Sequence, residues 1–357
     1  MKVKVLSTEI GRMMRILSGC IDPRDEKNSN VEISHNNNMF SIRAVNNGQF
    51  VKMSTPLLGG DGETFCVDGK MFANIIGRST GDVEITTDDK ICLVKSNGRT
   101  RIPIVNVKLP IPAEVSGSTF AVTGEDFISV TDRVRYASAQ DDTRPILTGV
   151  LLNVEHDRMT MAAVDGFQMA VESVYGQGDD MNIVVPNMLL KRICDCAGPE
   201  ECVGITTDGS RISFCTDTAE ITGSVLHGDF IDYQKIVPTS FTTSVLINVE
   251  ELKDALKGSG VVGNVKNLVK FIIHSDHLTV TSNSERADFE ADVPCQTNGN
   301  ELTIAFNDKY VMNALSALED DEIVIHLNTP VSPAIFSEKP RENLFIGTHL
   351  VLPVRVM

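Results

Sequence analysis

Four cysteines in the middle of the chain are the residues whose spacing comes nearest to that of a metal site. Cys194, Cys196, Cys202 and Cys215 follow one another as C-x-C-x5-C-x12-C, which matches none of the usual zinc-ligand spacings. Cys194 falls in an apolar run that predicts a helix, and Cys215 falls in one that predicts a strand. The pattern therefore favours buried thiols over a metal site, and no cofactor is expected.

Other residues with chemical potential also lack the neighbours that a reaction would need. His274 and His277 stand three residues apart in HSDH, but this stretch lies between two runs of β character and predicts a hairpin turn. The glycine-rich stretch GGDGET (59–64) is not a phosphate-binding loop, and Lys70 is followed by Met71 where such a loop needs Ser or Thr. Neither G-x-S-x-G nor H-E-x-x-H is present. The sequence does not predict an enzyme.

The composition is that of a soluble, multidomain protein. A chain of 357 residues has room for two or three domains, and 42% hydrophobic with 22% charged residues is ordinary for a globular protein. No apolar run approaches the length of a membrane span, and MKVKVLSTEI alternates like a strand instead of forming a signal peptide. Eight cysteines without an export signal predict reduced thiols and a cytoplasmic protein.

The elements that carry these residues recur along the chain. A short β-like run, a polar capping residue and apolar residues at helical spacing follow one another six times. The predicted caps are Ser7, Asp68, Thr123, Pro186, Asn248 and Asn307, at spacings of 61, 55, 63, 62 and 59 residues. The predicted helices are 7–17, 68–78, 123–135, 186–196, 248–258 and 307–317.

Strand-like stretches with turn signals fill the intervals between the helices. Examples are GVLLNVEHDRMTMAAVDG, RISFCTDTAEITGSVL and VKFIIHSDHLTVTSNSERADFEADV. Each interval of about sixty residues therefore reads as one helix with several antiparallel strands, and two such units form one domain. The alternative is the alternation of helices and strands that any α+β protein shows by chance, but the constant order in all six places favours a repeat.

Charge is divided between the helices and the rest of the chain. The six helical windows contain 11 basic and 10 acidic residues, a net charge of +1, while the whole chain has −16, so the remainder carries −17. Most of the acidic residues stand in the first helical turn, where the helix dipole favours them. Basic helices could attract phosphate while acidic strands repel it. The alternative is that Lys and Arg are simply good helix formers.

Four segments resemble the bacterial DNA polymerase III β subunit, the sliding-clamp family. They are YASAQDDTRPILTGVLLNVEHDRMTMAAVDGFQMA (136–170), GDFIDYQKIVP (228–238), FNDKYVMNALSAL (306–318) and VLPVRV (351–356). Their order and spacing fit that family over residues 115–357, whereas residues 1–114 fit in the layout of strands and helices alone. Four separate segments in the correct order are more specific than any single short motif.

The resemblance implies an α+β fold of three tandem clamp domains, each with two helices packed on antiparallel sheets. The expected domains are 1–114 (divergent), 115–238 and 239–357. Two chains of the family pair head to tail into a six-domain ring, which encircles duplex DNA without sequence specificity. The family performs no chemistry itself. A clamp loader places the ring, which then tethers DNA polymerases and repair factors. A clamp-fold interaction scaffold that no longer encircles DNA is the alternative.

The resemblance also implies a cleft that binds a short peptide of the partner proteins. Transferred residue by residue, the cleft comprises Arg144, Ile146, Leu147, Val164, Gly166, Phe167, Met169, Ile231, Ile236, Asn307, Tyr310, Val331, Pro333, Leu350, Leu352, Pro353, Val354 and Arg355. The apolar C-terminal stretch supports this reading, because it must either be buried or expose a binding patch. Phe167 and Gln168 replace the His and Arg that are usual in the family, so peptide preference is expected to differ.

Two further sets of residues follow from the resemblance. The residues expected to face DNA are Arg24, Arg133, Arg135, Lys191, Arg192, Lys253 and Lys309. The dimer joint is expected to place Ile102 and Ile104 of one chain against Val261 and Val262 of the other.

Overall fold

Among the described residues, six α-helices form at the positions that the sequence predicts. In the computed structural model they are α1 (Ser7–Ser18), α2 (Gly69–Ile76), α3 (Gly124–Arg135), α4 (Asn187–Cys196), α5 (Val249–Val261) and α6 (Asp308–Ser316). The side chains of Asp68, Asn248 and Asn307 accept hydrogen bonds from first-turn backbone N–H groups, as helix caps do. Ser7 does not cap α1 as expected, because it is already the first helical residue and Leu6 holds the N-cap position.

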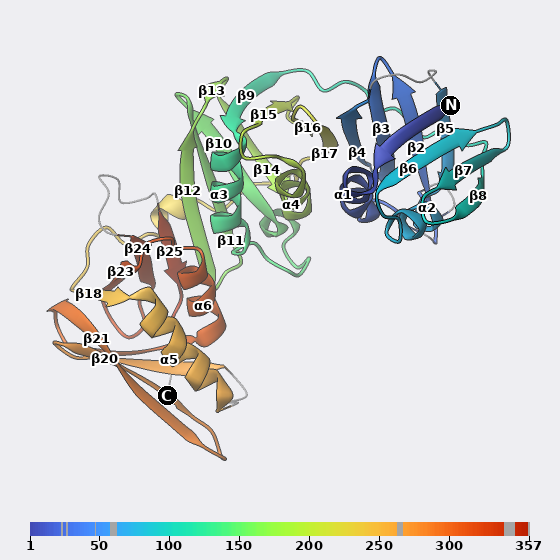
Figure 1. Ribbon diagram of the computed structural model, residues 1–357. Coiled ribbons are helices and arrows are strands. Elements are labelled where there is room, and N and C mark those ends of the chain that lie inside the picture. The colour runs from blue at the N-terminus through green and yellow to red at the C-terminus, as the bar shows by residue number, and fades with distance from the viewer. Residues whose placement is uncertain are drawn as a thin grey trace. The chain divides into compact units, whose positions relative to one another are not determined.

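The described residues are 1–22, 24–25, 28–46, 48–57, 63–262, 267–338 and 347–355, so most of the GGDGET stretch lies outside them. They fold into two units. The first consists of Met1–Ile128, Gly176–Asp179 and Met188–Val225, and the second of Ser129–Tyr175, Asp180–Asn187 and Leu226–Met357. Each unit contains its own complete sheets (Figure 1).

The first unit contains two antiparallel sheets. In spatial order the four-stranded sheet consists of β1 (Lys2–Leu6), β6 (Asp82–Thr87), β7 (Ile91–Lys95) and β8 (Arg99–Pro103). The nine-stranded sheet consists of β13 (Gln177–Gly178), β9 (Ser118–Thr123), β15 (Cys202–Thr207), β16 (Arg211–Cys215), β17 (Ala219–Ser224), β4 (Gln49–Pro56), β3 (Met39–Asn46), β2 (Asn30–Asn36) and β5 (Glu63–Asp68). Helices α1 and α2 pack against each other, and α1 contacts β3 and β4.

The second unit is built on one antiparallel sheet of twelve strands. Their spatial order is β14 (Met181–Pro186), β10 (Gly149–Glu155), β11 (Arg158–Val164), β12 (Gln168–Tyr175), β25 (Thr348–Val351), β24 (Ala334–Glu338), β23 (Glu322–Leu327), β18 (Thr243–Asn248), β21 (Asp288–Gly299), β20 (His277–Asn283), β19 (Leu268–Ile273) and β22 (Leu302–Asn307). Strand β25, near the C-terminus, pairs with β12 and β24. It thereby connects the strands of the chain's middle to those of its last third.

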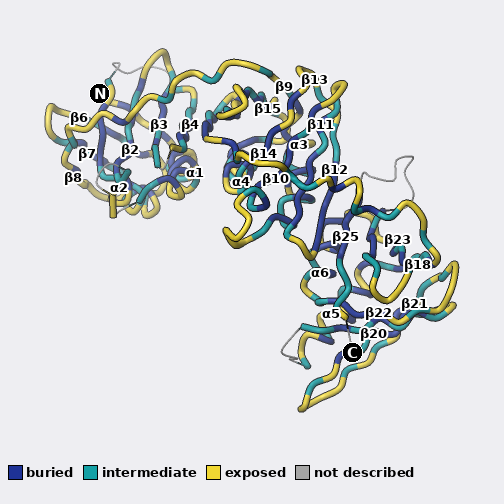
Figure 2. The backbone as a smooth tube through the Cα atoms, turned by 180° about the vertical axis from the view of Figure 1, so that it is seen from behind, coloured by how far each residue is buried: buried dark blue, intermediate teal, exposed yellow. Residues whose placement is uncertain are grey.

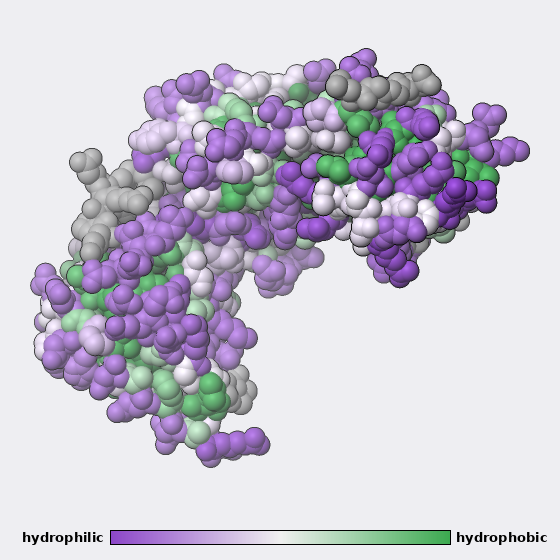
Figure 3. Space-filling view, in the orientation of Figure 1, coloured by the Kyte–Doolittle hydropathy of each residue, from purple (hydrophilic) through white to green (hydrophobic). Residues whose placement is uncertain are grey.

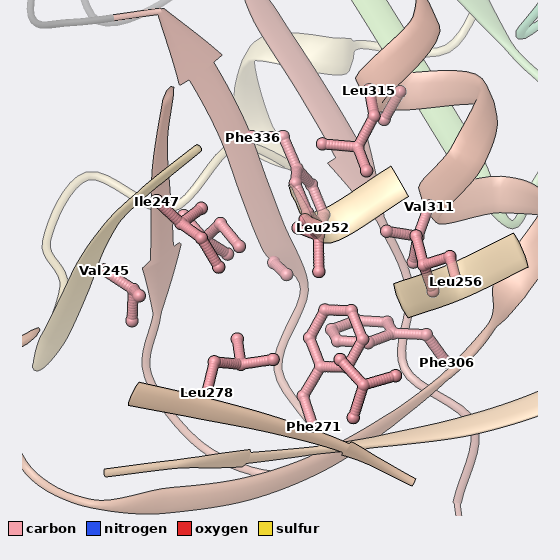
Figure 4. Packing of buried hydrophobic residues seen from close by; sticks show 14 of the residues in the cluster. Val245, Ile247, Leu252, Leu256, Phe271, Leu278, Phe306, Val311, Leu315 and Phe336 are labelled. Atoms are coloured by element: carbon pink, nitrogen blue, oxygen red, sulfur yellow. The ribbon is translucent and has the colours of Figure 1, made fainter. Parts of the chain in front are cut away.

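Buried hydrophobic side chains form the core beneath α5 and α6. Leu252 and Leu256 on α5 and Leu315 on α6 are almost fully buried over the strands (Figure 4). The rings of Phe271 and Phe306 meet edge to face with centroids 5.4 Å apart, a favourable geometry for an aromatic pair. Buried residues alternate with less buried ones along many strands, and most turns are exposed (Figure 2). The expected α+β class and the positions of the helices are confirmed.

The hairpin turn predicted at HSDH is confirmed, and a second hairpin lies within GVLLNVEHDRMTMAAVDG. His156 and Asp157 connect β10 to β11 with φ angles of 52° and 62°, as two-residue hairpin turns require. His274 and Asp276 fall in the turn between β19 and β20, where the backbone N–H of His274 donates to the carbonyl of His277. Among the described helices, none combines the length and apolar character needed to cross a membrane. The face shown in Figure 3 is mostly hydrophilic, with hydrophobic residues in smaller groups.

Candidate functional site

Seven of the predicted cleft residues meet in one apolar cluster of the second unit, called here the tail cluster. They are Val164, Met169 and Leu350 in its buried centre and Ile146, Ile231, Ile236 and Leu352, which are partly buried and pack around them. Partly buried apolar side chains around a buried centre form a surface that can take up an apolar side chain of another molecule.

Regular structure fixes the tail cluster in place. Met169 on β12 lies opposite Leu350 on β25 in an antiparallel pair. The short helix Pro145–Thr148 carries Ile146 and the buried Leu147, and the short helix Tyr233–Lys235 ends at Ile236. The cluster thus combines a sheet face with two helical turns, both of which begin in segments that the sequence assigned to the cleft.

The tail after β25 is held by single hydrogen bonds. The N–H of Leu352 donates to the carbonyl of Phe167 at 2.9 Å, and the N–H of Val354 donates to the carbonyl of Ala305 at 2.7 Å. Strand β25 itself ends at Val351. Pro353 has no N–H group and so cannot continue a ladder.

Phe167 and Tyr310 form a stacked aromatic pair beside the tail. Their rings lie 5.7 Å apart with an interplanar angle of 8°, and Phe167 is 59% exposed. Gly166 precedes it with a φ of 96°, a conformation that L side chains rarely adopt. The Asp165 carboxylate closes this turn, since its Oδ1 accepts hydrogen bonds from the N–H groups of Phe167 and Gln168. The turn presents the Phe167 ring outward.

The other predicted cleft residues lie outside the tail cluster. Arg144 and Val331 are exposed on loops, and Pro333 is half-buried. Asn307 serves as the cap of α6. Arg355 is exposed at the end of the described tail. These positions leave their side chains, apart from that of Asn307, open to a binding partner.

A cavity of about 720 Å³ adjoins the aromatic pair. It is lined by Tyr136, Ser138, Ala139, Gln140, Asp141, Asp165, Phe167, Gln168, Leu256, Lys257, Gly260, Asn267, Asp308, Lys309, Tyr310, Met312 and Asn313. Only Phe167, Tyr310 and Lys309 among these were predicted as site residues. The others come from five separate segments, and no local sequence pattern indicates that these segments converge.

Arg133 does not fit its expected position facing DNA. Its side chain is only 12% exposed, and Nη2 lies 2.7 Å from Oε1 of Glu172 and 3.0 Å from Oε1 of Glu338. On α3 it follows Val130 by three residues and so lies beside the buried face of the helix. Because two carboxylates already neutralise its charge, we exclude Arg133 from the residues expected to contact phosphate.

Three of the predicted DNA-facing residues pair with acids on their own helix. The pairs are Arg135–Asp132, Lys191–Asp195 and Lys253–Glu250, with N–O distances of 2.9, 2.6 and 2.9 Å. The Lys253 side chain is only 19% exposed, whereas those of Arg135 and Lys191 are more open to solvent; solvent-exposed pairs are weak, so phosphate can displace the acid there.

The other predicted DNA-facing residues differ in their surroundings. Arg192 donates to the carbonyl of Gly19 at 2.7 Å and also contacts Gln49, so it connects parts of the first unit. The Arg24 side chain is 90% exposed, with Asp22 at 3.3 Å. Lys309 is exposed.

The four residues predicted for the dimer joint differ in exposure to solvent. Ile102 is only 1% exposed, because β8 turns it into the core of its own sheet, and Ile104 is half-buried. Ile102 is therefore not free for a partner. Val261 ends α5 and is 86% exposed, and Val262 beside it is half-buried.

The cysteines differ partly from expectation. Cys196 is buried and burial raises its pKa to about 12, but Cys202 and Cys215 are exposed. The predicted helix and strand positions of Cys194 and Cys215 are confirmed. Within the described residues, no group of three or more His, Cys, Asp or Glu side chains could hold a metal ion.

Two family models match the chain. Residues 121–232 match the central domain of the DNA polymerase III beta subunit, and residues 234–355 match its C-terminal domain. The Beta sliding clamp of Streptomyces coelicolor is 26% identical over 309 residues, which is 82% of each chain. The Beta sliding clamp of Synechococcus elongatus is 25% identical over 304 residues, 80% of each chain.

Solved structures show the same fold over the whole chain. The DNA polymerase III beta subunit of Thermotoga maritima superposes with a TM-score of 0.88 at 23% identity and covers 100% of both chains. The DNA polymerase sliding clamp of Bacillus subtilis gives a TM-score of 0.90 at 20% identity, again with 100% of both chains covered.

Proposed function

Since this chain belongs to the DNA polymerase III beta subunit family, the sliding clamps, we propose that it forms a ring of two chains around duplex DNA. Three clamp domains per chain, 1–114, 115–238 and 239–357, would close a six-domain ring as a head-to-tail homodimer. The ring would act in the cytoplasm as a processivity factor without a catalytic site. A clamp loader would place it, and DNA polymerases and repair factors would dock on the tail cluster.

The proposal of a dimer is supported by two strand edges that are not paired with another described strand and that have opposite charge. Strand β8 is an end strand of its sheet and exposes Arg99 and Arg101. In β21, the half from Asp288 to Pro294 pairs with β20 on one side, while β18 pairs only with the half after it. This open half exposes Glu290 and Asp292. An open edge can pair with the edge of another chain, and complementary charge would select the partner.

The ends of two helices extend this joint. A cavity of about 550 Å³ lies in the first unit between α2, β7 and β8, and Met71, Ile75 and Val94 are among its lining residues. In the second unit, a Cβ added to Gly258 of α5 would lie 2.6 Å from the Phe289 ring, so α5 packs on the open half of β21. Edge pairing would bring the exposed Val261 of one chain toward the cavity of the other. Ile104, but not Ile102, remains a candidate contact.

The alternative function is an interaction scaffold that has lost DNA encirclement. It is favoured by the many helix cations that already have acidic partners, Arg133 most of all. Under this alternative the peptide-binding surface would persist, but the ring would not hold DNA. Arg24, Arg135, Lys191 and Lys309 are the cations on which retention would depend.

The two functions separate in one experiment. The chain is loaded with a clamp loader onto nicked circular DNA, and the DNA is then cut once. A sliding clamp stays on the circle and leaves the linear DNA by its ends, whereas a scaffold is not retained on either form. Replacing Arg24, Arg135, Lys191 and Lys309 by Glu should weaken retention and flatten its salt dependence, by about one unit of slope per lost phosphate contact.

A further inference from the structure

Phe167 connects the cavity beside the aromatic pair to the tail cluster. The carbonyl of Phe167 accepts the hydrogen bond from Leu352, and its ring stacks on Tyr310, which lines the cavity. Leu256 and Met312 add apolar surface on the α5 and α6 sides. A peptide bound along the tail therefore has a second recess within reach of its flanking residues. This continuity rests on the proposed peptide-binding function.

The charged side chains that line the cavity differ in how many hydrogen bonds and ion pairs they already have. Asp165 accepts three hydrogen bonds from Phe167 and Gln168, and Lys257 is paired with Asp254 at 2.8 Å. Asp308 differs, because its Oδ1 is buried without a hydrogen-bond partner among the described residues, and the backbone N–H of Lys309 is the donor that its half-buried carboxyl group has. A buried carboxylate oxygen without a donor is costly.

The cavity lining carries more negative than positive charges. Three carboxylates, those of Asp141, Asp165 and Asp308, face two ammonium groups. One of these two, Lys257, already has an acidic partner outside the lining, and the exposed Lys309 is the other. A ligand group that brings a positive charge and several N–H donors would complement this lining better than an anion.

The aromatic wall narrows the choice of cation. Phe167 is more than half exposed while one face of its ring meets Tyr310. A guanidinium is planar, stacks on aromatic rings and donates to carboxylates from a fixed fork, whereas an ammonium is compact and more strongly hydrated. A guanidinium can use an aromatic surface and an acid with one unsatisfied oxygen at the same time.

We propose that this cavity is a second subsite that binds an arginine side chain of a partner peptide whose apolar anchor occupies the tail cluster. The guanidinium stacks on the Phe167–Tyr310 pair and donates to Asp308. Partners with a basic residue flanking their apolar anchor are thereby preferred over partners with a neutral or acidic one.

The test compares matched peptides on the full-length protein. A labelled Gln-x-x-Leu-x-Phe peptide is made with arginine on one flank or the other, and each version has a twin with citrulline, which keeps the planar shape but not the charge. Fluorescence anisotropy should show about fivefold tighter binding for the arginine twin on one flank. Asp308→Asn should abolish this ratio, while Glu285→Gln, which removes an exposed charge from the turn between β20 and β21, should preserve it.

Equal affinities of the twins on both flanks would overturn the proposal, as would a ratio that survives Asp308→Asn. If no peptide binds, the docking of partners on the tail cluster fails, and the subsite is tested alone with acetylarginine amide. The methyl NMR signal of Met312, assigned through Met312→Leu, should then shift with this probe and not with acetylcitrulline amide, and Asp308→Asn should suppress the shift. No difference between the probes would overturn the subsite by itself.

Discussion

Arg133 on α3 and Glu172 on β12 form a buried ion pair, with Nη2 2.7 Å from Oε1. Glu338 at the end of β24 lies 3.0 Å from the same nitrogen. From β25, His349 places Nε2 3.4 Å from Oε1 of Glu172, and its Nδ1 is 2.9 Å from the hydroxyl of Tyr136. Leu350, the next residue, belongs to the tail cluster. One buried polar array thus connects α3 to the three strands that position the tail.

Removing Arg133 should therefore destabilise the protein strongly. Arg133→Met removes the guanidinium from beside the buried Glu172 and Glu338, and breaking a buried pair in this way lowers the free energy of unfolding by about 3–5 kcal/mol. Adding Glu172→Gln should restore part of this loss, because it removes the buried carboxylate that lies nearest the lost guanidinium. Urea denaturation followed by circular dichroism measures all three proteins.

An exposed pair supplies the control for this prediction. Lys191→Met removes a cation from the pair with Asp195, whose side chains are each almost half exposed, and should cost less than about 1 kcal/mol. A loss for Arg133→Met as small as that for Lys191→Met would show that the array contributes little to stability.

The carboxyl group of Asp308 should make stability depend on pH in an unusual direction. Burial raises its pKa above the ordinary 3.8, so between these two values the folded state binds more protons than the unfolded state. The stability that Asp308 contributes by binding this proton is fully present below pH 3.8, and it is lost as the pH rises through the pKa of Asp308 in the folded state. Asp308→Asn should therefore be more stable than the wild type at neutral pH, and this advantage should vanish in acid.

The measurement is the free energy of unfolding of both proteins across this pH range. Asp208→Asn gives the contrast. Hydrogen bonds from the backbone of Arg211 and Ser210 lower the pKa of Asp208 to about 2, so the contribution of Asp208 is present above pH 3.8 and is lost as the pH falls toward 2. If Asp308→Asn and Asp208→Asn changed the free energy of unfolding in the same way across this pH range, the raised pKa of Asp308 would be contradicted.

Helix positions were predictable from the sequence because caps and apolar spacing are local. Asp68, Asn248 and Asn307 each combine a capping side chain with an amphipathic run, and the helices begin directly after them. At Ser7 the same signal failed by one position. There the N-cap position, which is again the last residue of the preceding strand, falls on Leu6, whose side chain cannot accept a hydrogen bond.

The site was only partly predictable, because its remaining features depend on contacts between distant segments. Met169 and Leu350 were expected to meet, and the structure pairs them. Arg133 looked like any basic helix residue, since its partners are 39 and 205 residues away along the chain. Asp308 likewise looked like an ordinary acidic residue of a first turn, and nothing in its neighbourhood in the sequence indicates a cavity.

The proposed dimer joint should respond to charge reversal. Replacing Arg99 and Arg101 by Glu places acids opposite the acidic half of β21, and like charges across an interface are repulsive. Dimer affinity should fall at least about tenfold, and Glu290→Lys in the same chain should recover part of it. Sedimentation velocity at several concentrations gives the affinities. A dimer unaffected by the reversal would place the joint elsewhere than on β8.

The C-terminal tail should be needed for peptide binding and not for the dimer. Deleting residues 352–357 removes Leu352 from the tail cluster and both tail hydrogen bonds, to Phe167 and Ala305, while β8 and β21 are left intact. Burial of an apolar anchor of a partner is worth about 1.5–3 kcal/mol, and such interfaces depend on a few anchors. Anisotropy with the labelled Gln-x-x-Leu-x-Phe peptide should therefore show loss of binding.

The truncated protein also tests what the tail does for the fold. Because β25 ends at Val351 and keeps its pairing with β12 and β24, the sheet should persist and sedimentation should still show a dimer. Leu352→Ala provides a milder change, with weaker peptide binding expected from an intact tail backbone. Unchanged peptide affinity in the truncated protein would remove residues 352–355 from the site. Loss of the dimer would instead mean that the tail supports the fold, since the proposed joint contains none of its residues.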